Sequence, residues 1–221
     1  MYNQVITFLS KEFLLEWRQK YALNGILLYT TSTIFICYLS FSLRGSSMNP
    51  IVWNTLFWII ILFSAINAIA KSFLQESPGR SLYYYTITNP QALILSKILY
   101  NSLLMILVAL VALVIYSTLL GNPVQDHGLF IVNLLLGSIG FASVLTMISG
   151  IASKAGNNSM LMAILSFPII VPLILMVIKV SRNAIDGIAR SESLDEILVL
   201  LALNAIIITL ALLLFPFLWR N

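Results

Sequence analysis

Six long apolar stretches alternate with short polar segments along the chain. They lie near residues 21–43, 51–70, 92–120, 129–152, 159–180 and 196–218. As a helix, which rises about 1.5 Å per residue, each stretch is long enough to cross about 30 Å of hydrocarbon. A helix also pairs its own backbone groups, which lipid cannot do. The pattern therefore predicts an all-α integral membrane protein with six transmembrane helices, in a single domain of residues 1–221.

Two of these helices have a clear start signal. Asn49-Pro50 and Asn89-Pro90 stand directly before the second and third apolar stretches. Asparagine is a preferred N-cap residue, and proline suits the first helical turn because its missing N–H has no partner there. We therefore expect helices to begin at these two dipeptides.

Residues 1–20 precede the first stretch and have another pattern. Five apolar residues share one helical stripe: Val5, Ile6, Leu9, Phe13 and Trp17. Thr7, Lys11 and Arg18 lie roughly opposite. This arrangement predicts an amphipathic helix at the membrane surface. The alternative is an ordinary helical lead-in to the first span. The first apolar stretch, from about Tyr21, is too long for the core of a signal peptide, so we expect no cleaved signal.

The basic residues predict the orientation. If both termini share one side of the membrane, that side holds eight of them: Lys11, Arg18, Lys20, Lys71, Arg80, Lys97, Lys154 and Arg220. The other side holds four: Arg44, Lys179, Arg182 and Arg190. Lysine and arginine concentrate on the cytoplasmic side, so both termini are expected in the cytoplasm. Lys97, in the second turn of its helix, is expected to reach back to the lipid head groups.

Composition excludes a soluble globular domain. Hydrophobic residues make up 60% of the chain and charged residues 9%, against about 25% charged residues in soluble domains. The formal charge of +4 gives no indication of a nucleic-acid partner. The single cysteine, Cys37, lies in an apolar run, which rules out an intramolecular disulfide and a cysteine metal cluster. We interpret it as a packing residue.

The sequence carries no recognisable reaction machinery. There is no phosphate-binding loop, no H-E-x-x-H motif and no glycine-rich dinucleotide fingerprint. His127 is the only histidine, so a histidine metal cluster and a Ser/His couple are excluded. It could ligate iron or sense pH, or be a solvated turn residue. We predict no enzyme activity and no catalytic, cofactor-binding or metal-binding residues in this chain.

The predicted spans contain few polar residues. They include four asparagines, Asn67, Asn101, Asn133 and Asn204. No Asp, Glu, Lys or Arg lies near the middle of a span, which disfavours a pump driven by protons or ions. We expect the asparagines to bridge helices by hydrogen bonds, rather than to bind a substrate.

Two spans carry signals for helix packing and bending. Small residues recur at every fourth position of the fourth span, at Ser138, Ala142, Thr146 and Gly150. They predict close approach of a neighbouring backbone. The fifth span contains Pro168 and Pro172, which predict a kink. Either feature fits ordinary bundle packing, and the kink also fits a bend that moves during transport.

The polar segment 71–91 is the most particular part of the chain. It is too long for a bare turn and carries charges of both signs. Ser77-Pro78-Gly79 interrupts it, and an aromatic cluster at Tyr83-Tyr84-Tyr85 follows. Aromatic residues and arginine outside the bilayer favour a surface that docks a partner. The alternative is a belt of tyrosines at the membrane surface.

The same segment carries a family resemblance. Phe73-Leu74-Gln75-Glu76, then Leu82, then Asn89-Pro90 leading to Lys97, resembles the corresponding loop of the heme exporter protein B (CcmB) family. Pro168-x-x-x-Pro172 with Leu173-Ile174 is similar to that family's fifth helix. The sequence departs from the family where Ser77-Pro78 intervenes and where Arg80 replaces an expected acid.

The resemblance implies an ABC-2-like permease subunit of cytochrome c maturation, in the bacterial inner membrane. It implies a separate CcmA-like ATPase that uses ATP, a CcmC-like heme-handling membrane protein and, indirectly, a CcmE-like heme chaperone. Heme would be a substrate of the complex, and a second copy of the chain could take part. The ATPase-coupling residues would be Phe73, Leu74, Gln75, Glu76, Arg80, Leu82 and Tyr83. Export of a lipid or polysaccharide and a non-transporting scaffold are the alternatives.

Overall fold

The structure, a computed structural model, describes residues 2–19, 21–42, 48–69, 89–154 and 159–220, and these are almost entirely helical. The helices are α1 (Tyr2–Gln19), α2 (Tyr21–Ser42), α3 (Pro50–Ile69), α5 (Pro90–Leu120), α6 (His127–Lys154), α7 (Ser159–Asp186), the short 3₁₀ helix η1 (Arg190–Ser193) and α8 (Leu194–Arg220). The described residues contain no strand.

The prediction of six transmembrane helices is confirmed for the described part of the chain. Helices α2, α3, α5, α6, α7 and α8 are each long and apolar enough to cross a membrane. Their ends agree with the predicted ones within two residues, except that α7 continues to Asp186 instead of ending near residue 180. Residues 181–186 are largely polar, so hydropathy marks the edge of the lipid there and not the end of the helix.

The two predicted start signals are also confirmed. The Asn49 side chain accepts a hydrogen bond from the amide of Ile51 at 2.9 Å. Asn89 accepts one from the amide of Gln91 at 3.0 Å. Each bond satisfies an N–H that has no partner inside the helix.

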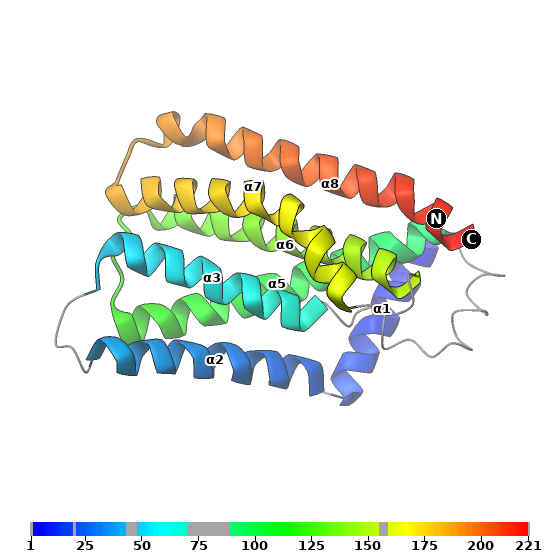
Figure 1. The fold of residues 1–221 in the computed structure, drawn as a ribbon, viewed down its shortest axis with the longest axis horizontal. Coiled ribbons are helices and arrows are strands. Elements are labelled where there is room, and N and C mark those ends of the chain that lie inside the picture. The colour runs from blue at the N-terminus through cyan, green and yellow to red at the C-terminus, as the bar shows by residue number, and fades with distance from the viewer. Residues whose placement is uncertain (1, 20, 43–47, 70–88, 155–158, 221) are drawn as a thin grey trace.

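The spans form a bundle around α6 (Figure 1), which contacts α3, α5, α7 and α8. Every residue from Phe141 to Gly150 of α6 is buried. The two ends of the chain lie at the same end of the bundle (Figure 1), which we call the terminal end. The turns before α6 and α8 lie at the opposite end.

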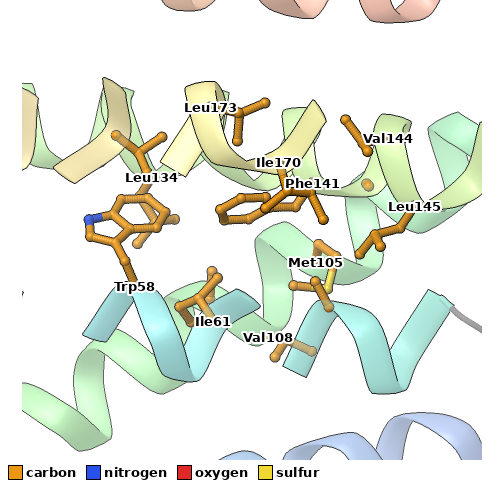
Figure 2. Close-up of a cluster of buried hydrophobic side chains, with 14 of the residues drawn as sticks. Trp58, Ile61, Met105, Val108, Leu134, Phe141, Val144, Leu145, Ile170 and Leu173 are labelled. Atoms are coloured by element: carbon orange, nitrogen blue, oxygen red, sulfur yellow. The ribbon is translucent and has the colours of Figure 1, made fainter. Parts of the chain in front are cut away.

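Apolar side chains from four helices meet in the middle of the bundle (Figure 2). Trp58 of α3 and Phe141 of α6 have ring centroids 6.1 Å apart, and Met105 of α5 and Ile170 of α7 belong to the same cluster. Cys37 is half-buried and packs against this core, as predicted. Lipid is as apolar as these side chains, so close packing and hydrogen bonds hold the helices together.

Three asparagines bridge helices, as predicted. The bridges are Asn101 to the Thr146 hydroxyl at 2.8 Å, Asn133 to the Val177 carbonyl at 2.7 Å and Asn204 to the Leu136 carbonyl at 3.2 Å. The prediction is wrong for Asn67, which donates to the Phe63 carbonyl of its own helix at 3.0 Å. Its side chain is exposed, and its donor is used within the helix.

Candidate functional site

The predicted docking segment lies mostly outside the described residues. Its coupling residues, Phe73, Leu74, Gln75, Glu76, Arg80, Leu82 and Tyr83, fall among residues 70–88, which the structure does not describe. The described flanks are the end of α3 at Ile69 and the start of α5 at Pro90. Both flanks lie at the terminal end of the bundle (Figure 1). The segment therefore enters and leaves the bundle there.

Helix α1 lies across this end of the bundle, at a steep angle to α2 (Figure 1). It contacts α5 and α2. A helix is thus confirmed at the N-terminal end of the described residues, and its place at the membrane surface stays a prediction. A helix in this position can follow the membrane surface while the other helices cross the membrane.

The side of α1 that faces α5 carries both apolar and charged residues, and Phe13 meets the Tyr100 ring of α5 edge to face at 5.4 Å. Phe8 packs against the core, and Glu12 and Glu16 lie at four-residue intervals on the same face. Ile6 and Phe13 of the predicted stripe stay exposed. Exposed apolar residues are what a membrane-facing stripe requires, so the amphipathic surface helix stays a prediction.

Lys97 is the first of these partners. Its side chain is only 3% exposed, and its Nζ lies 3.5 Å from Oε1 of Glu12. The expectation that Lys97 reaches back to the head groups is therefore wrong. A buried ammonium needs a compensating charge, and a carboxylate that is 85 positions away in the sequence supplies it.

Glu16 adds two further bonds. The Tyr100 hydroxyl of α5 donates to Oε2 of Glu16 at 3.4 Å, and the amide of Leu23 donates to Oε1 at 2.7 Å. That amide lies in the first turn of α2, where it has no partner inside the helix. Glu12, Glu16, Lys97 and Tyr100 together form what we call the α1–α5 joint. It fixes α1 to two transmembrane helices.

The predicted small residues of α6 are buried. Ser138, Ala142, Thr146 and Gly150 all lie inside the bundle, and Thr146 accepts the bond from Asn101 of α5. Their role in helix contact stays a prediction.

Neighbouring helices also approach α6 closely at two glycines that sequence reasoning missed. A Cβ at Gly137 would lie 2.8 Å from the Trp58 ring and 3.0 Å from Cγ1 of Val177. A Cβ at Gly140 would collide with the side chain of Leu173. Glycines inside a membrane helix are themselves a signal of close packing, and this signal could have found them.

Pro168 and Pro172 lie inside α7. Helix α7 changes direction in its yellow part in Figure 1. A proline has no amide hydrogen, so the carbonyls four residues earlier, at Ile164 and Pro168, lose their helical partners. Two hydrogen bonds of the helix backbone, one turn apart, are therefore missing at this point.

His127 lies at the opposite end of the bundle, as the exposed first residue of α6. Its Nε2 lies 3.0 Å from the side-chain amide nitrogen of Asn122. Among the residues that the structure describes, no group of three or more His, Cys, Asp and Glu could hold a metal ion. These contacts are those of a turn residue.

The neighbouring Asp126 joins two turns at this opposite end. It accepts two hydrogen bonds from Arg190, at 2.6 and 2.7 Å, and one from the amide of Leu129 in the first turn of α6. The bonds from Arg190 favour the charged carboxylate and hold the pKa of Asp126 well below its usual range.

Comparison with known proteins agrees with this architecture. The profile of the CcmB protein family matches residues 3–218, which run from α1 to the end of α8. No curated protein matches the sequence, and no solved structure does. The matched residues include the predicted docking segment and the four residues of the α1–α5 joint. The chain therefore belongs to the CcmB family, and it is a multi-pass membrane permease component of heme export in cytochrome c maturation.

Proposed function

We propose that this chain is the permease subunit of an ABC-type complex, in which a partner's ATP hydrolysis drives motion of the transmembrane helices. The terminal end of the bundle, with both chain ends, faces the cytoplasm of a bacterium and meets a CcmA-like ATPase. The whole chain, residues 1–221, acts as one transmembrane domain. A permease of this kind contributes moving helices, and the partner contributes the chemistry.

The position of the α1–α5 joint is the observation that carries this proposal. Segment 71–91 leads directly into α5 at Pro90, and Lys97 and Tyr100 follow in the next turns. These two residues hold Glu12 and Glu16 of α1. A displacement of the segment therefore reaches the start of α5 and, through the joint, the surface helix α1.

The complex would use this motion to release a heme-loaded CcmE-like chaperone, with heme held by a CcmC-like membrane protein. The chain itself supplies no catalytic residue in this account. Pro168 and Pro172 would allow α7 to bend, and the buried small residues of α6 would give the helices a close contact. A second copy of the chain would complete the permease.

Loss of the docking residues tests the proposal. Replacing Gln75, Glu76 and Leu82 together by alanine should abolish co-purification of the ATPase and the production of holocytochrome c, while the protein stays inserted. Replacing Glu192, Asp195 and Leu198 at the opposite end, where all three are exposed, is the matched control. Survival of both co-purification and maturation in the first variant would show that the coupling assignment is wrong.

A second variant separates a permease from a passive scaffold. If the ATPase partner binds ATP but cannot hydrolyse it, a permease complex should lose maturation of cytochrome c. A scaffold that only gathers partners should keep it. Normal maturation in a strain that lacks this chain would instead indicate export of another substrate, such as a lipid.

A further inference from the structure

Polar side chains from two helices meet on the part of α7 that follows its prolines. The indole N–H of Trp58 on α3 donates to the Ser181 hydroxyl at 2.7 Å. The amide of Asn133 on α6 donates to the same hydroxyl at 2.6 Å and to the Val177 carbonyl at 2.7 Å. Ser181 in turn donates to that carbonyl. The hydroxyl thus uses its one hydrogen and both lone pairs.

A fourth residue adds to this group. Asn54 of α3 donates to the Ile178 carbonyl at 2.9 Å. The side chains of Trp58, Asn133 and Ser181 are fully buried, and Asn54 is nearly so. No lipid tail can replace these bonds, so breaking them leaves polar groups unpaired. We call Asn54, Trp58, Asn133 and Ser181 the α7 clamp.

Backbone contacts hold the same part of α7. Leu173 packs against the backbone of α6 at Gly140, and Val177 packs against it at Gly137, because a glycine has no side chain in the way. Near the end of α7, the Ala184 carbonyl accepts hydrogen bonds from the backbone amides of residues 125 and 126, at 3.2 and 2.9 Å. Residues 173–186 are therefore fixed to α3, to α6 and to the turn before α6.

The preceding part of α7 is built differently. From residue 164 to 172, only Ser166 and Ile170 are buried, and Phe167 is 71% exposed. The two missing backbone bonds fall in this same stretch, because Pro168 and Pro172 supply no amide hydrogen. The weakest part of the α7 backbone thus directly precedes the clamped part.

We propose that α7 moves in two parts during the ATP-driven cycle. Residues 173–186 stay fixed through the clamp, and residues 159–172 swing about Pro168 and Pro172. The moving part lies toward the terminal end of the bundle (Figure 1). This inference rests on the proposed function, since it needs an ATP-dependent motion of the helices. It assigns Asn54, Trp58, Asn133 and Ser181 as positioning residues.

Spin-label distances test the proposal in the complex with the ATPase. The background is Cys37→Ser, which removes the only cysteine. A label at Leu110 of α5 is paired with one at Phe167 or at Leu175, since all three side chains are exposed. On binding ATP, the 110–167 distance should change by more than about 2 Å, beyond a small helix shift. The 110–175 distance should stay within that limit.

Two variants of the clamp complete the test. Asn133→Leu, or the smaller change Ser181→Ala, should make the 110–175 distance respond to ATP. The control Asn67→Leu changes an exposed asparagine that bonds its own helix and should leave it constant. Equal shifts of both distances in the unmodified clamp would overturn the two-part motion while supporting the coupling. No shift at either pair, with ATP bound to the partner, would overturn the coupling and this inference with it.

Discussion

At the scale of single residues, Lys97 has an unusual environment for a charged side chain. Charged side chains inside membrane bundles are rare and are costly without a partner. Lys97 is buried in the second turn of α5 and faces Glu12 of α1. This pairing ties α1 to α5 across 85 positions of sequence.

Removing the Lys97 charge should destabilise the protein. Lys97→Met leaves the Glu12 carboxylate without its buried partner, and breaking such a pair costs about 3 kcal/mol. The double variant Glu12→Met with Lys97→Met removes both charges and should recover most of the loss. The measurement is the apparent melting temperature in detergent, at one scan rate.

A pair at the opposite end provides the control. Lys179 binds Glu196 at 2.9 Å, but its side chain is 57% exposed. Glu196 is only 15% exposed, but water reaches the Lys179 ammonium, and a pair with such an exposed partner contributes about 1 kcal/mol or less. Lys179→Met should therefore have a much smaller effect than Lys97→Met. Equal effects of the two substitutions would contradict the special role of the α1–α5 joint.

Gly137 offers a second test at this scale. The added methyl group of Gly137→Ala would lie 2.8 Å from ring carbons of Trp58, and overpacking of this kind costs about 1–3 kcal/mol. Gly25→Ala is the control, because among the described residues no atom outside its own stretch of helix lies within 4 Å of the new methyl group. Thermal unfolding of the two variants should show a loss for the first and none for the second. A stable Gly137→Ala variant would mean that α3, α6 and α7 pack less closely than described.

At the scale of elements, the turns at the opposite end are tied together. Asp126 precedes α6 and Arg190 opens η1, so their ion pair links the turn before α6 to the turn before α8. Gly187 follows α7 with a positive φ of 69°, a backbone conformation that residues other than glycine rarely adopt. The chain thus reverses direction within a few residues on each side of the pair.

The Asp126 pair predicts a dependence of stability on pH. The pKa of Asp126 is lowered in the folded protein, so its contribution is complete above the unfolded value near pH 4 and is lost as the pH falls through the folded value. Asp126→Asn should lower the melting temperature at pH 7. The difference from the unmodified protein should shrink below about pH 4. A difference that stays constant from pH 7 to pH 3 would exclude the ion pair as its source.

The sequence was sufficient to predict the helices because each one is specified locally. An apolar stretch of sufficient length gives the span, and Asn49 and Asn89 cap helices within their own neighbourhoods. Asn54 was overlooked near the start of its span, although it donates to the Ile178 carbonyl of α7. The contacts of single residues were harder to predict because their partners are distant in the sequence.

The candidate site shows the same limit. Segment 71–91 was identified from its charges, its Ser77-Pro78-Gly79 break and its tyrosines, all of which are local. The partnership of Glu12 and Lys97 was missed, because each residue alone has the pattern of a charge at the membrane surface. Only the packing of α1 against α5 brings them together.

At the scale of the whole molecule, the fold separates a packed centre from a surface built for contacts. Helix α6 contacts four neighbouring spans, while α1 and the start of α5 lie at the end that holds both termini (Figure 1). A heme exporter permease of this family needs a source of energy. The terminal end is where our account places the partner that supplies it.

The position of that partner can be measured directly by photo-cross-linking in living cells. A photoreactive amino acid at Gln75 should form an adduct with the ATP-binding subunit, because segment 71–91 is the proposed docking surface. The same amino acid at Glu192, at the opposite end, should form none. An adduct at Glu192, or none at Gln75 in a strain that still matures cytochrome c, would contradict the account.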